Sequence, residues 1–211
     1  MTVPDEIPIM RLSNVFLFPQ ALLPLHIFEP QYRAMLADCL ESDRMFAIDS
    51  SPHVVGSKKR PKLHKVAGVG IIRACVNQKN GTSNLILQGI QRVRILDYIH
   101  SASYPKAHVK TLESTFVDTV EVDALCFKLK ELLSDLNDDL SNPSMVKYLK
   151  RLENAEILTD LVSYWLLKTC EHKREVLETM DLRERLRKVR QMLIEECASG
   201  KLRSEPGDSA K

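Results

Sequence analysis

The apolar positions of this 211-residue chain change their spacing near residue 115. Up to about Leu112 they come in short runs separated by turn signals, which is typical of β-strands. The runs predict strands at Ile7–Leu12, Met45–Ile48, Val66–Ala74, Asn84–Gln88, Gln91–Leu96 and Ala107–Leu112. Asn80-Gly81 supplies the positive φ angles that a tight turn needs, so the strands on either side of it should form an antiparallel hairpin.

One short helix is predicted within this strand-rich half. Pro30 suits a first helical position, because its missing N–H has no partner there in any case. The residues that share one face after it, at helical spacing, are Met35, Leu36, Cys39 and Leu40.

Beyond residue 115 the apolar positions follow a helical period and predict three or four packed helices. The apolar stripes are Val122, Leu125, Leu129, Leu132 and Leu136; Ile157, Leu158, Leu161, Val162, Trp165 and Leu166; and Leu182, Leu186, Val189 and Leu193. Asn142-Pro143 and Asp181-Leu182-Arg183-Glu184 have the spacing of helix starts. We interpret Trp165 as a core residue, because its position continues an apolar stripe.

The sequence from Phe16 to Arg33 is an apolar run interrupted by Pro19, Pro24 and Pro30. Proline fixes its own φ, donates no backbone hydrogen bond and favours extended geometry in the preceding residue. The run therefore cannot be one continuous helix or central strand, and it predicts a bent ribbon. Such a ribbon either crosses at the edge of a barrel or forms a surface that receives another chain.

Composition limits the class of function. The 30 Lys and Arg balance 28 Asp and Glu to a formal net charge of +2, so electrostatics alone predict no nucleic-acid partner. The apolar stretch at residues 15–28 is too short and too interrupted for a membrane span or signal peptide, and we expect a cytoplasmic protein. The five cysteines are far apart and include no Cys-x-x-Cys pair, which favours buried free thiols.

Catalytic motifs are missing from the sequence. It contains no G-x-x-x-x-G-K-[ST] phosphate loop and no H-E-x-x-H, and Gly68 and Gly70 lie in a strand pattern without a third glycine partner. The six histidines show no i,i+4 pair and no neighbouring cluster of carboxylates or thiols. We therefore assign no catalytic residue, no metal ligand and no cofactor.

Several segments resemble, in order, the N-terminal substrate-binding domain of Lon protease. The opening of that domain is matched by Ile7–Leu12, Val15–Pro19 and Leu23–Arg33; its G-T-x-A strand by Val66–Ile72; its L-x-G-x-x-R-x-x-I strand pair by Leu87–Ile95; and the helix that follows the barrel in bacterial Lon by Lys173–Leu186. The resemblance extends over about residues 5 to 197.

The resemblance implies an α+β fold, a PUA-like β-barrel with a short inserted helix followed by a C-terminal α-helical bundle. We expect the barrel at residues 1–115, the bundle at 116–197 and a disordered tail at 198–211. In full-length Lon this domain precedes an ATPase module and a Ser-Lys protease domain, and this chain ends before either, so we expect no enzyme. The family's domain recognises unfolded or degron-bearing polypeptides and helps to assemble the oligomer. The expectation is thus a polypeptide-binding module, acting as an adaptor, with a homodimer left open.

Candidate contact residues come from the proline-interrupted run and one later strand. The apolar candidates are Phe16, Phe18, Leu25, Ile27, Phe28 and Tyr32, and the polar candidates at the rim are Arg33, Arg92 and Arg94. The alternative is that the apolar residues fill the core, because a small barrel needs large side chains inside it. Likewise, Arg92 and Arg94 share one strand face, which is simply solvated in this alternative.

Two other functions stay open on the sequence. PUA-like barrels in other families bind RNA, and Lys58-Lys59-Arg60-Pro61-Lys62 offers positive charge, although a solvated turn explains it more simply. A hydrolase assembled from dispersed residues is the other, and it requires titratable groups within hydrogen-bond reach in a pocket.

Overall fold

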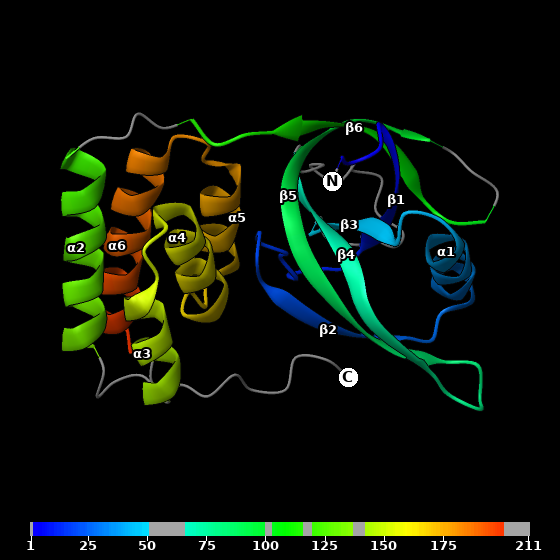
Figure 1. Cartoon of the computed structure of the whole chain (residues 1–211), viewed down its shortest axis with the longest axis horizontal. Coiled ribbons are helices and arrows are strands. Elements are labelled where there is room, and N and C mark those ends of the chain that lie inside the picture. The colour runs from blue at the N-terminus through cyan, green and yellow to red at the C-terminus, as the bar shows by residue number, and fades with distance from the viewer. Residues whose placement is uncertain (1, 51–65, 100–102, 116–119, 137–141, 201–211) are drawn as a thin grey trace. The chain divides into compact units, whose positions relative to one another are not determined.

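The computed structural model describes residues 2–50, 66–99, 103–115, 120–136 and 142–200 (Figure 1). The basic segment at 58–62 and residues 201–211 of the predicted tail lie outside this part. The chain divides into two compact units, Met1–Glu113, called unit 1, and Ser114–Lys211, called unit 2. Its described part is a mixed α/β structure with a six-stranded sheet in unit 1.

Unit 1 contains one sheet and one helix. The strands are β1 (Glu6–Arg11), β2 (Leu22–Ile27), β3 (Met45–Asp49), β4 (Val66–Asn77), β5 (Ser83–Ile99) and β6 (Lys106–Leu112), and the helix is α1 (Pro30–Glu41). The strand order is β2-β5-β4-β3-β1-β6, and β5 also pairs with β6. β1 and β3 are parallel, whereas the other pairs are antiparallel. The long strand β5 therefore has three partners, β2, β4 and β6.

The predicted hairpin is confirmed, with one difference in its turn. β4 and β5 are antiparallel, and the N–H of Gly81 donates to the carbonyl of Gln78 at 2.9 Å. Only Gly81 has a positive φ, at 80°, whereas both central residues were expected to have one. Asn80 contributes through its side chain instead, because its Oδ1 accepts hydrogen bonds from the N–H and hydroxyl of Thr82.

Two strand predictions were wrong. β2 was missed, because Pro24 lies in its middle. The structure accommodates this proline since β2 pairs with β5 alone among the described strands, and an edge strand tolerates a missing N–H. β5 is one strand through Gly89, where two separate strands were predicted.

The proline-interrupted run is bent, and its first part crosses closely over β4 and β5. A Cβ added to Gly68 would lie 1.9 Å from the carbonyl oxygen of Leu17, and one added to Gly89 would lie 2.0 Å from that of Phe18. Next to this crossing, the N–H of Gln20 donates to the carbonyl of Gly89 at 2.8 Å. The two glycines are thus required where one backbone lies directly on another.

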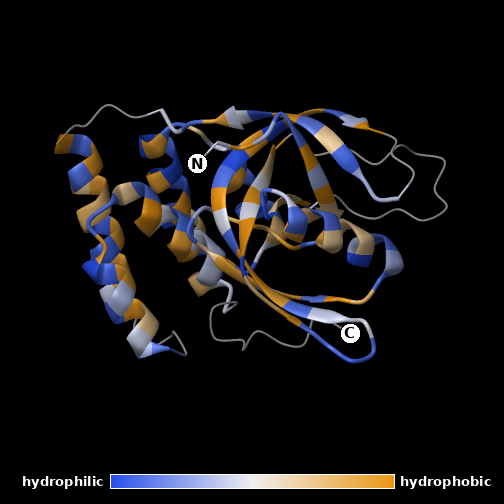
Figure 2. Cartoon of the chain, turned by 45° about the vertical axis from the view of Figure 1, so that its right-hand side comes forward, coloured by the Kyte–Doolittle hydropathy of each residue, from blue (hydrophilic) through white to orange (hydrophobic). Residues whose placement is uncertain are grey.

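Hydrophobic residues, in orange, recur along the strands of the sheet (Figure 2). Their buried side chains form two clusters, on opposite faces of the sheet. Along β3, Phe46 and Ile48 belong to the cluster that includes α1, whereas Met45 and Ala47 belong to a second cluster. We call the first cluster the α1 core; its other buried members are Met10, Leu17, Ile27, Tyr32, Met35, Leu36, Cys39, Ile72, Leu85, Leu87 and Tyr104. The second contains Val3, Ile7, Ile9, Ala67, Val69, Ile71, Val93, Ile95, Ala107 and Val109.

The described part of unit 2 consists of helices. They are α2 (Val120–Asp135), α3 (Pro143–Arg151), α4 (Ala155–Trp165), α5 (Cys170–Glu178) and α6 (Leu182–Ala198). Both predicted helix starts are confirmed, because Asn142 Oδ1 accepts from the N–H of Met145 and Asp181 Oδ1 from that of Glu184. The expected three or four helices are five in the described ranges, and Trp165 is half-buried against Tyr148 rather than fully buried.

Two charged side chains are buried in unit 2. Arg185 is fully buried; one of its guanidinium nitrogens donates to Ser114 Oγ at 2.8 Å and to Glu156 Oε1 at 3.1 Å, and the other lies 3.6 Å from buried Asp160. Glu196, which is 1% exposed, accepts hydrogen bonds from the backbone N–H groups of Lys168 and Thr169 at the start of α5. Charge, and not only apolar contact, therefore organises this interior.

Candidate functional site

Four of the six apolar candidates belong to the interior of unit 1. Phe16, Phe18, Ile27 and Tyr32 are at most 6% exposed, as the core interpretation of these residues required. The hydroxyl of Tyr32 lies 3.2 Å from the N–H of Arg11 and donates to its carbonyl. Burial raises the pKa of Tyr32 above its usual value. These four side chains are therefore part of the interior and are not exposed contacts.

Phe28 is the apolar candidate that faces solvent. It is 60% exposed and follows directly on β2. Its ring stacks on that of His26, with the ring centroids 5.9 Å apart and an interplanar angle of 21°. The Nδ1 atom of His26 lies 2.7 Å from Asn84 Oδ1 on β5, so the stack is anchored to the sheet. The remaining candidate, Leu25, is half-buried against the α1 core.

The strand register extends this exposed site across three strands. Directly paired residues of neighbouring strands project from the same face of a sheet. His26 pairs with Asn84 and Asn84 with Val76, while Pro24 pairs with Ile86. We call this surface the hairpin face; it comprises Leu22, Pro24, His26, Phe28, Ala74, Val76, Asn84 and Ile86.

The hairpin face is rich in exposed apolar side chains. Leu22 and Val76 are 54% and 60% exposed, and Ile86 is half-buried between them. On the opposite face of the same strands, Leu85 and Leu87 are buried in the α1 core. Since large apolar side chains are mostly buried, a row of them exposed on one face of a strand pair makes the hairpin face the candidate interaction surface.

The hairpin face ends at an edge strand. β2 pairs with β5, and no described strand pairs with its other side. Such an edge presents backbone groups to which an extended chain can bind, and Pro24 removes one donor from it. Sequence reasoning identified the proline interruption but not the strand that contains it.

The two arginine candidates on β5 have different environments. Arg92 is 4% exposed and its guanidinium lies 5.9 Å from the ring centre of Phe18, whereas Arg94 is exposed. Arg92 pairs with Gly68, directly where the backbone at Leu17 and Phe18, called the crossing segment, covers β4. The expectation that both form a rim or a solvated side was therefore wrong for Arg92.

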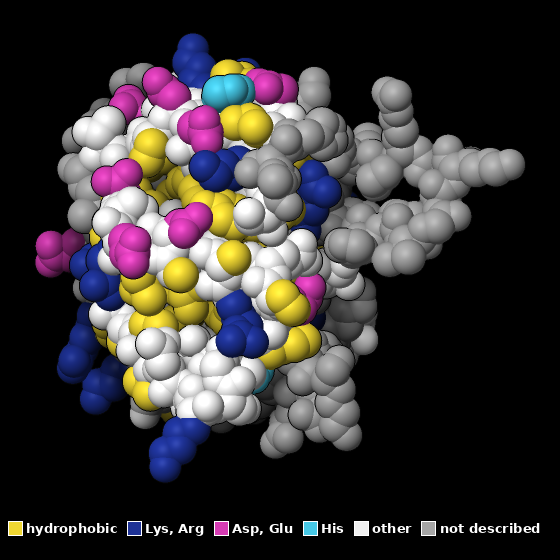
Figure 3. All heavy atoms as spheres, turned by 90° about the vertical axis from the view of Figure 1, so that its right-hand side faces the viewer, with side chains coloured by type: hydrophobic (Ala, Val, Ile, Leu, Met, Phe, Trp, Pro, Cys, Tyr) yellow, Lys and Arg dark blue, Asp and Glu magenta, His cyan; other side chains and the backbone are white. Residues whose placement is uncertain are grey.

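Arg33, the third polar candidate, lines a pocket of about 420 Å³ between α1 and the β4–β5 hairpin. The pocket is lined by Arg33, Leu36, Ala37, Leu40, Glu41, Asn77, Gly81 and Ser83. On the face that carries α1, hydrophobic side chains gather in groups between charged ones (Figure 3). Sequence reasoning singled out Arg33 but did not bring it together with the hairpin.

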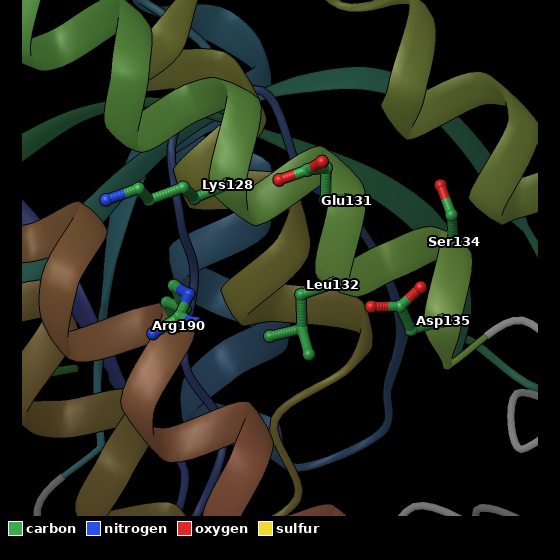
Figure 4. A pocket seen from close by; sticks show the side chains of 6 residues that line it. All are labelled: Lys128, Glu131, Leu132, Ser134, Asp135 and Arg190. Carbon is green, nitrogen blue, oxygen red and sulfur yellow. The ribbon is translucent and has the colours of Figure 1, made fainter.

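A second cavity, of about 610 Å³, lies in unit 2 between α2 and α6. It is lined by Lys128, Glu131, Leu132, Ser134, Asp135 and Arg190. Lys128 and Arg190 lie to one side of Leu132, and Asp135 lies to the other (Figure 4). Because two cationic and two acidic groups surround one leucine, the cavity favours neither sign of charge in a ligand.

Residues 6–195 match the family described as the ATP-dependent protease La (LON) substrate-binding domain. The chain belongs to the Lon substrate-binding domain family. The resemblance found in the sequence motifs is thereby confirmed over most of the chain. The family description concerns substrate binding, so it supports a substrate-recognition module.

Curated relatives of this Lon domain are much longer proteins. Lon protease of Dictyoglomus thermophilum is 25% identical over 197 residues, which cover 92% of this chain and 25% of that protein. Lon protease of Anaeromyxobacter dehalogenans is 26% identical, with 90% of this chain and 23% of that protein covered. The chain therefore spans about a quarter of the length of the curated relatives it matches.

Solved structures show the same fold. The N-terminal domain of Mycobacterium avium complex Lon protease has a TM-score of 0.72 at 20% identity, covering 90% of this chain and 98% of that one. A Lon N-terminal domain protein from Xanthomonas campestris has a TM-score of 0.63 at 18% identity, covering 87% and 96%. The mixed architecture predicted from the sequence is thus shared with Lon N-terminal domains.

The described residues of the Lon domain include neither a metal-binding cluster nor a membrane-spanning helix. Among the described residues, no group of three or more His, Cys, Asp or Glu side chains is placed to hold a metal ion. No helix in the described ranges is long and apolar enough to cross a membrane. None of the five cysteines forms a disulfide. Cys39 is buried, which raises the pKa of its thiol to about 12, and the others are half-buried rather than buried as predicted.

Proposed function

We propose that this Lon domain binds extended or unfolded polypeptide segments on the hairpin face, with Phe28 as the main contact. The observation that carries the proposal is the exposed, stacked ring of Phe28 at one end of an apolar row on β2, β5 and β4. The family's description as a substrate-binding domain supports a polypeptide as the ligand.

The chemistry of the hairpin face suits an apolar segment of a polypeptide. Burying a Phe or Leu side chain that was exposed is worth about 1.5–3 kcal/mol, so Phe28, Leu22 and Val76 together supply useful affinity. The edge of β2 adds backbone hydrogen bonds if the ligand is extended, and these bonds are indifferent to sequence. This combination fits a domain that receives many unfolded segments.

The buried candidates contribute indirectly in this proposal. Phe16, Phe18, Ile27 and Tyr32 fix the segment before β2 and α1, and Leu25 packs beneath the hairpin face. Arg94 is exposed but pairs with Val66 and Lys110, so it lies outside that face. The pairings of β5 with both β4 and β6 support a sheet closed into a PUA-like barrel. We propose that the domain itself is non-catalytic and acts in the cytoplasm as an adaptor for unfolded or degron-bearing polypeptides. No observation among the described residues favours RNA.

A binding experiment with a permanently unfolded protein tests the proposal. Reduced, carboxymethylated α-lactalbumin is titrated into wild-type protein and into the Phe28→Ala and Leu22→Ser variants. Because each variant removes an exposed apolar contact, we expect its affinity to fall at least fivefold, in line with the loss of about 1 kcal/mol or more.

Leu96→Ser is the matched control, because Leu96 is 58% exposed on the same strand β5 but lies outside the hairpin face. We expect it to bind like the wild type. Equal binding by wild type and Phe28→Ala, with both folded by circular dichroism, would show that the hairpin face is not the site. Tyr32→Ala is unsuitable as a test, because Tyr32 is buried in the α1 core.

A further inference from the structure

Arg33 is an exposed cation that lies beside the turn of the β4–β5 hairpin. No hydrogen bond or ion pair joins its guanidinium to another residue in the described part of the chain. The turn of the hairpin lies directly against it, since a Cβ added to Gly81 would lie 2.3 Å from one guanidinium nitrogen. Gly81 therefore leaves space for the guanidinium, which faces the pocket between α1 and the hairpin.

The floor of this pocket is apolar and its two ends carry opposite charges. Leu36, Ala37 and Leu40 lie along it. Glu41 is eight residues after Arg33 on α1, about 12 Å along the helix axis at 1.5 Å per residue. Arg33 also belongs to the first turns of α1, where the partial positive charge of the helix end favours an anion.

The hairpin contributes a polar group beside the cation. Asn77 Oδ1 accepts a hydrogen bond from Ser83 Oγ at 2.9 Å, which leaves the amide NH₂ of Asn77 as a donor. Both residues line the pocket together with Arg33. A carboxylate placed there would receive charge-assisted hydrogen bonds from the guanidinium and a further bond from the amide.

We infer that this pocket, called the carboxylate pocket below, binds the C-terminal residue of a polypeptide that ends in an apolar side chain. The α-carboxylate pairs with Arg33, and the side chain lies over Leu36 and Leu40. A terminal residue is the one part of a polypeptide that joins a carboxylate and an apolar side chain at one carbon. The hairpin turn against Arg33 bounds that end of the pocket, which suits a chain that stops there.

The inference rests on the proposed polypeptide binding but uses a different surface. Ser83 and Leu36 belong to the α1 side of the sheet, whereas the hairpin face is on the other side of the same strands. The domain thus has one surface for the interior of an unfolded chain and one for its end. Loss of either surface leaves the other measurable.

Fluorescence polarisation with paired peptides tests the carboxylate pocket. Two eight-residue peptides of one sequence, labelled at the N-terminus and ending in Leu, differ only in a free or an amidated C-terminus. We expect the free acid to bind wild-type protein at least tenfold tighter, which corresponds to about 1.4 kcal/mol and is within what a hydrogen bond between charged groups supplies. Arg33→Gln should reduce this preference to less than about twofold.

Three controls complete the experiment. Lys110→Gln removes an equal charge from an exposed position on β6 and should keep the preference, while Leu40→Asp should weaken binding of the free acid. Phe28→Ala should weaken the binding of unfolded α-lactalbumin and leave the preference for the free acid over the amide unchanged. If wild-type protein binds the free-acid and amidated peptides equally, or if Arg33→Gln keeps the preference for the free acid, the pocket does not bind a chain end.

An amidated peptide with an internal Asp before the Leu distinguishes the other source of a carboxylate. If it binds as tightly as the free acid, the pocket recognises acidic side chains and the inference is wrong. If unfolded α-lactalbumin binds but no acid preference appears, only the inference fails. If neither ligand binds, the proposed function itself fails.

Discussion

Unit 1 and unit 2 differ in what their interiors depend on. In unit 1 a backbone segment lies directly on the sheet, at Gly68 and Gly89, so there is no space for an added atom. In unit 2 the guanidinium of Arg185 and the carboxylate of Glu196 are buried and hydrogen-bonded. Unit 1 buries charge as well, at Asp49, which accepts from the Tyr98 hydroxyl at 2.7 Å. The difference teaches that unit 1 should be most sensitive to added volume and unit 2 to lost charge.

The largest effect is expected for Arg185→Met. It leaves the carboxylate of Asp160, which is 2% exposed, without its buried cation, and breaking such a pair costs about 3–5 kcal/mol. Urea unfolding followed by the fluorescence of Trp165, the only tryptophan, reports on unit 2. Arg187→Met on the same helix is the control, because its side chain is 59% exposed. A loss below about 1 kcal/mol at Arg185 would contradict the role of buried charge.

Gly89→Ala should destabilise unit 1 by about 3 kcal/mol, at the upper end of overpacking costs, because its Cβ would meet backbone atoms of Phe18. Gly70→Ala should cost less, about 1 kcal/mol, since its Cβ would meet side-chain atoms of Leu87 and Leu17 that can change rotamer. Hydrogen exchange of the β4 and β5 amides measures both. Equal costs for the two variants would mean that the crossing segment moves away freely.

Glu196→Gln should cost unit 2 about 1–3 kcal/mol at neutral pH, with exposed Glu195→Gln nearly neutral. Burial alone would raise the pKa of Glu196, but hydrogen bonds from Lys168, Thr169 and His172 outweigh it and lower the pKa. A lowered folded-state pKa contributes stability above the unfolded value of about 4.3. That stability is lost as the pH falls through the folded pKa. Urea titrations between about pH 7 and 3 should show the two proteins converge at low pH; a constant gap would refute the assignment.

The smallest effect is expected at the hairpin face. Phe28→Ala should change the free energy of unfolding by less than about 0.5 kcal/mol, because the ring is 60% exposed. Phe18 is the fully buried aromatic residue for comparison, and Phe18→Ala should lower the free energy of unfolding by about 3–5 kcal/mol. Thermal unfolding of the pair compares them. A large loss at Phe28 would indicate that its ring supports the fold rather than a ligand.

Much of the fold was predictable because apolar spacing reports burial. The predicted runs Met45–Ile48 and Val66–Ala74 lie in β3 and β4, which have apolar contacts on both faces of the sheet. β2 was missed because proline is rare in strands, and its tolerance depends on being at an edge, which is a property of the sheet and not of the segment. No apolar stripe predicted α5, because it buries only Val176 and Leu177. The one helix that the resemblance implied for Lys173–Leu186 is two helices, since α5 ends at Glu178 and α6 begins at Leu182.

The site was predictable only in part, because residues of one type in one run face different sides. Phe16 and Phe28 are both aromatic and twelve positions apart, yet one is 4% and the other 60% exposed. The same holds for Arg92 and Arg94, where the crossing segment covers the first and not the second. The pocket at Arg33 needs the hairpin turn at Gly81, almost fifty residues later, and no local pattern reports such a meeting.

The pairing of β1 with β6 has a consequence for how the chain folds during synthesis. Ile7 pairs with Ala107, and the Nζ of Lys106 lies 3.0 Å from a carboxylate oxygen of Glu6. The ribosome therefore adds about one hundred residues after β1, which takes roughly 5–20 s at the ordinary rates of translation, before β6 is available to pair with it. Contacts so distant in sequence also slow the search for the native state, whereas the helices of unit 2 form from nearby residues. During that interval β1 has an unpaired side, so the nascent domain is itself a chain in need of protection.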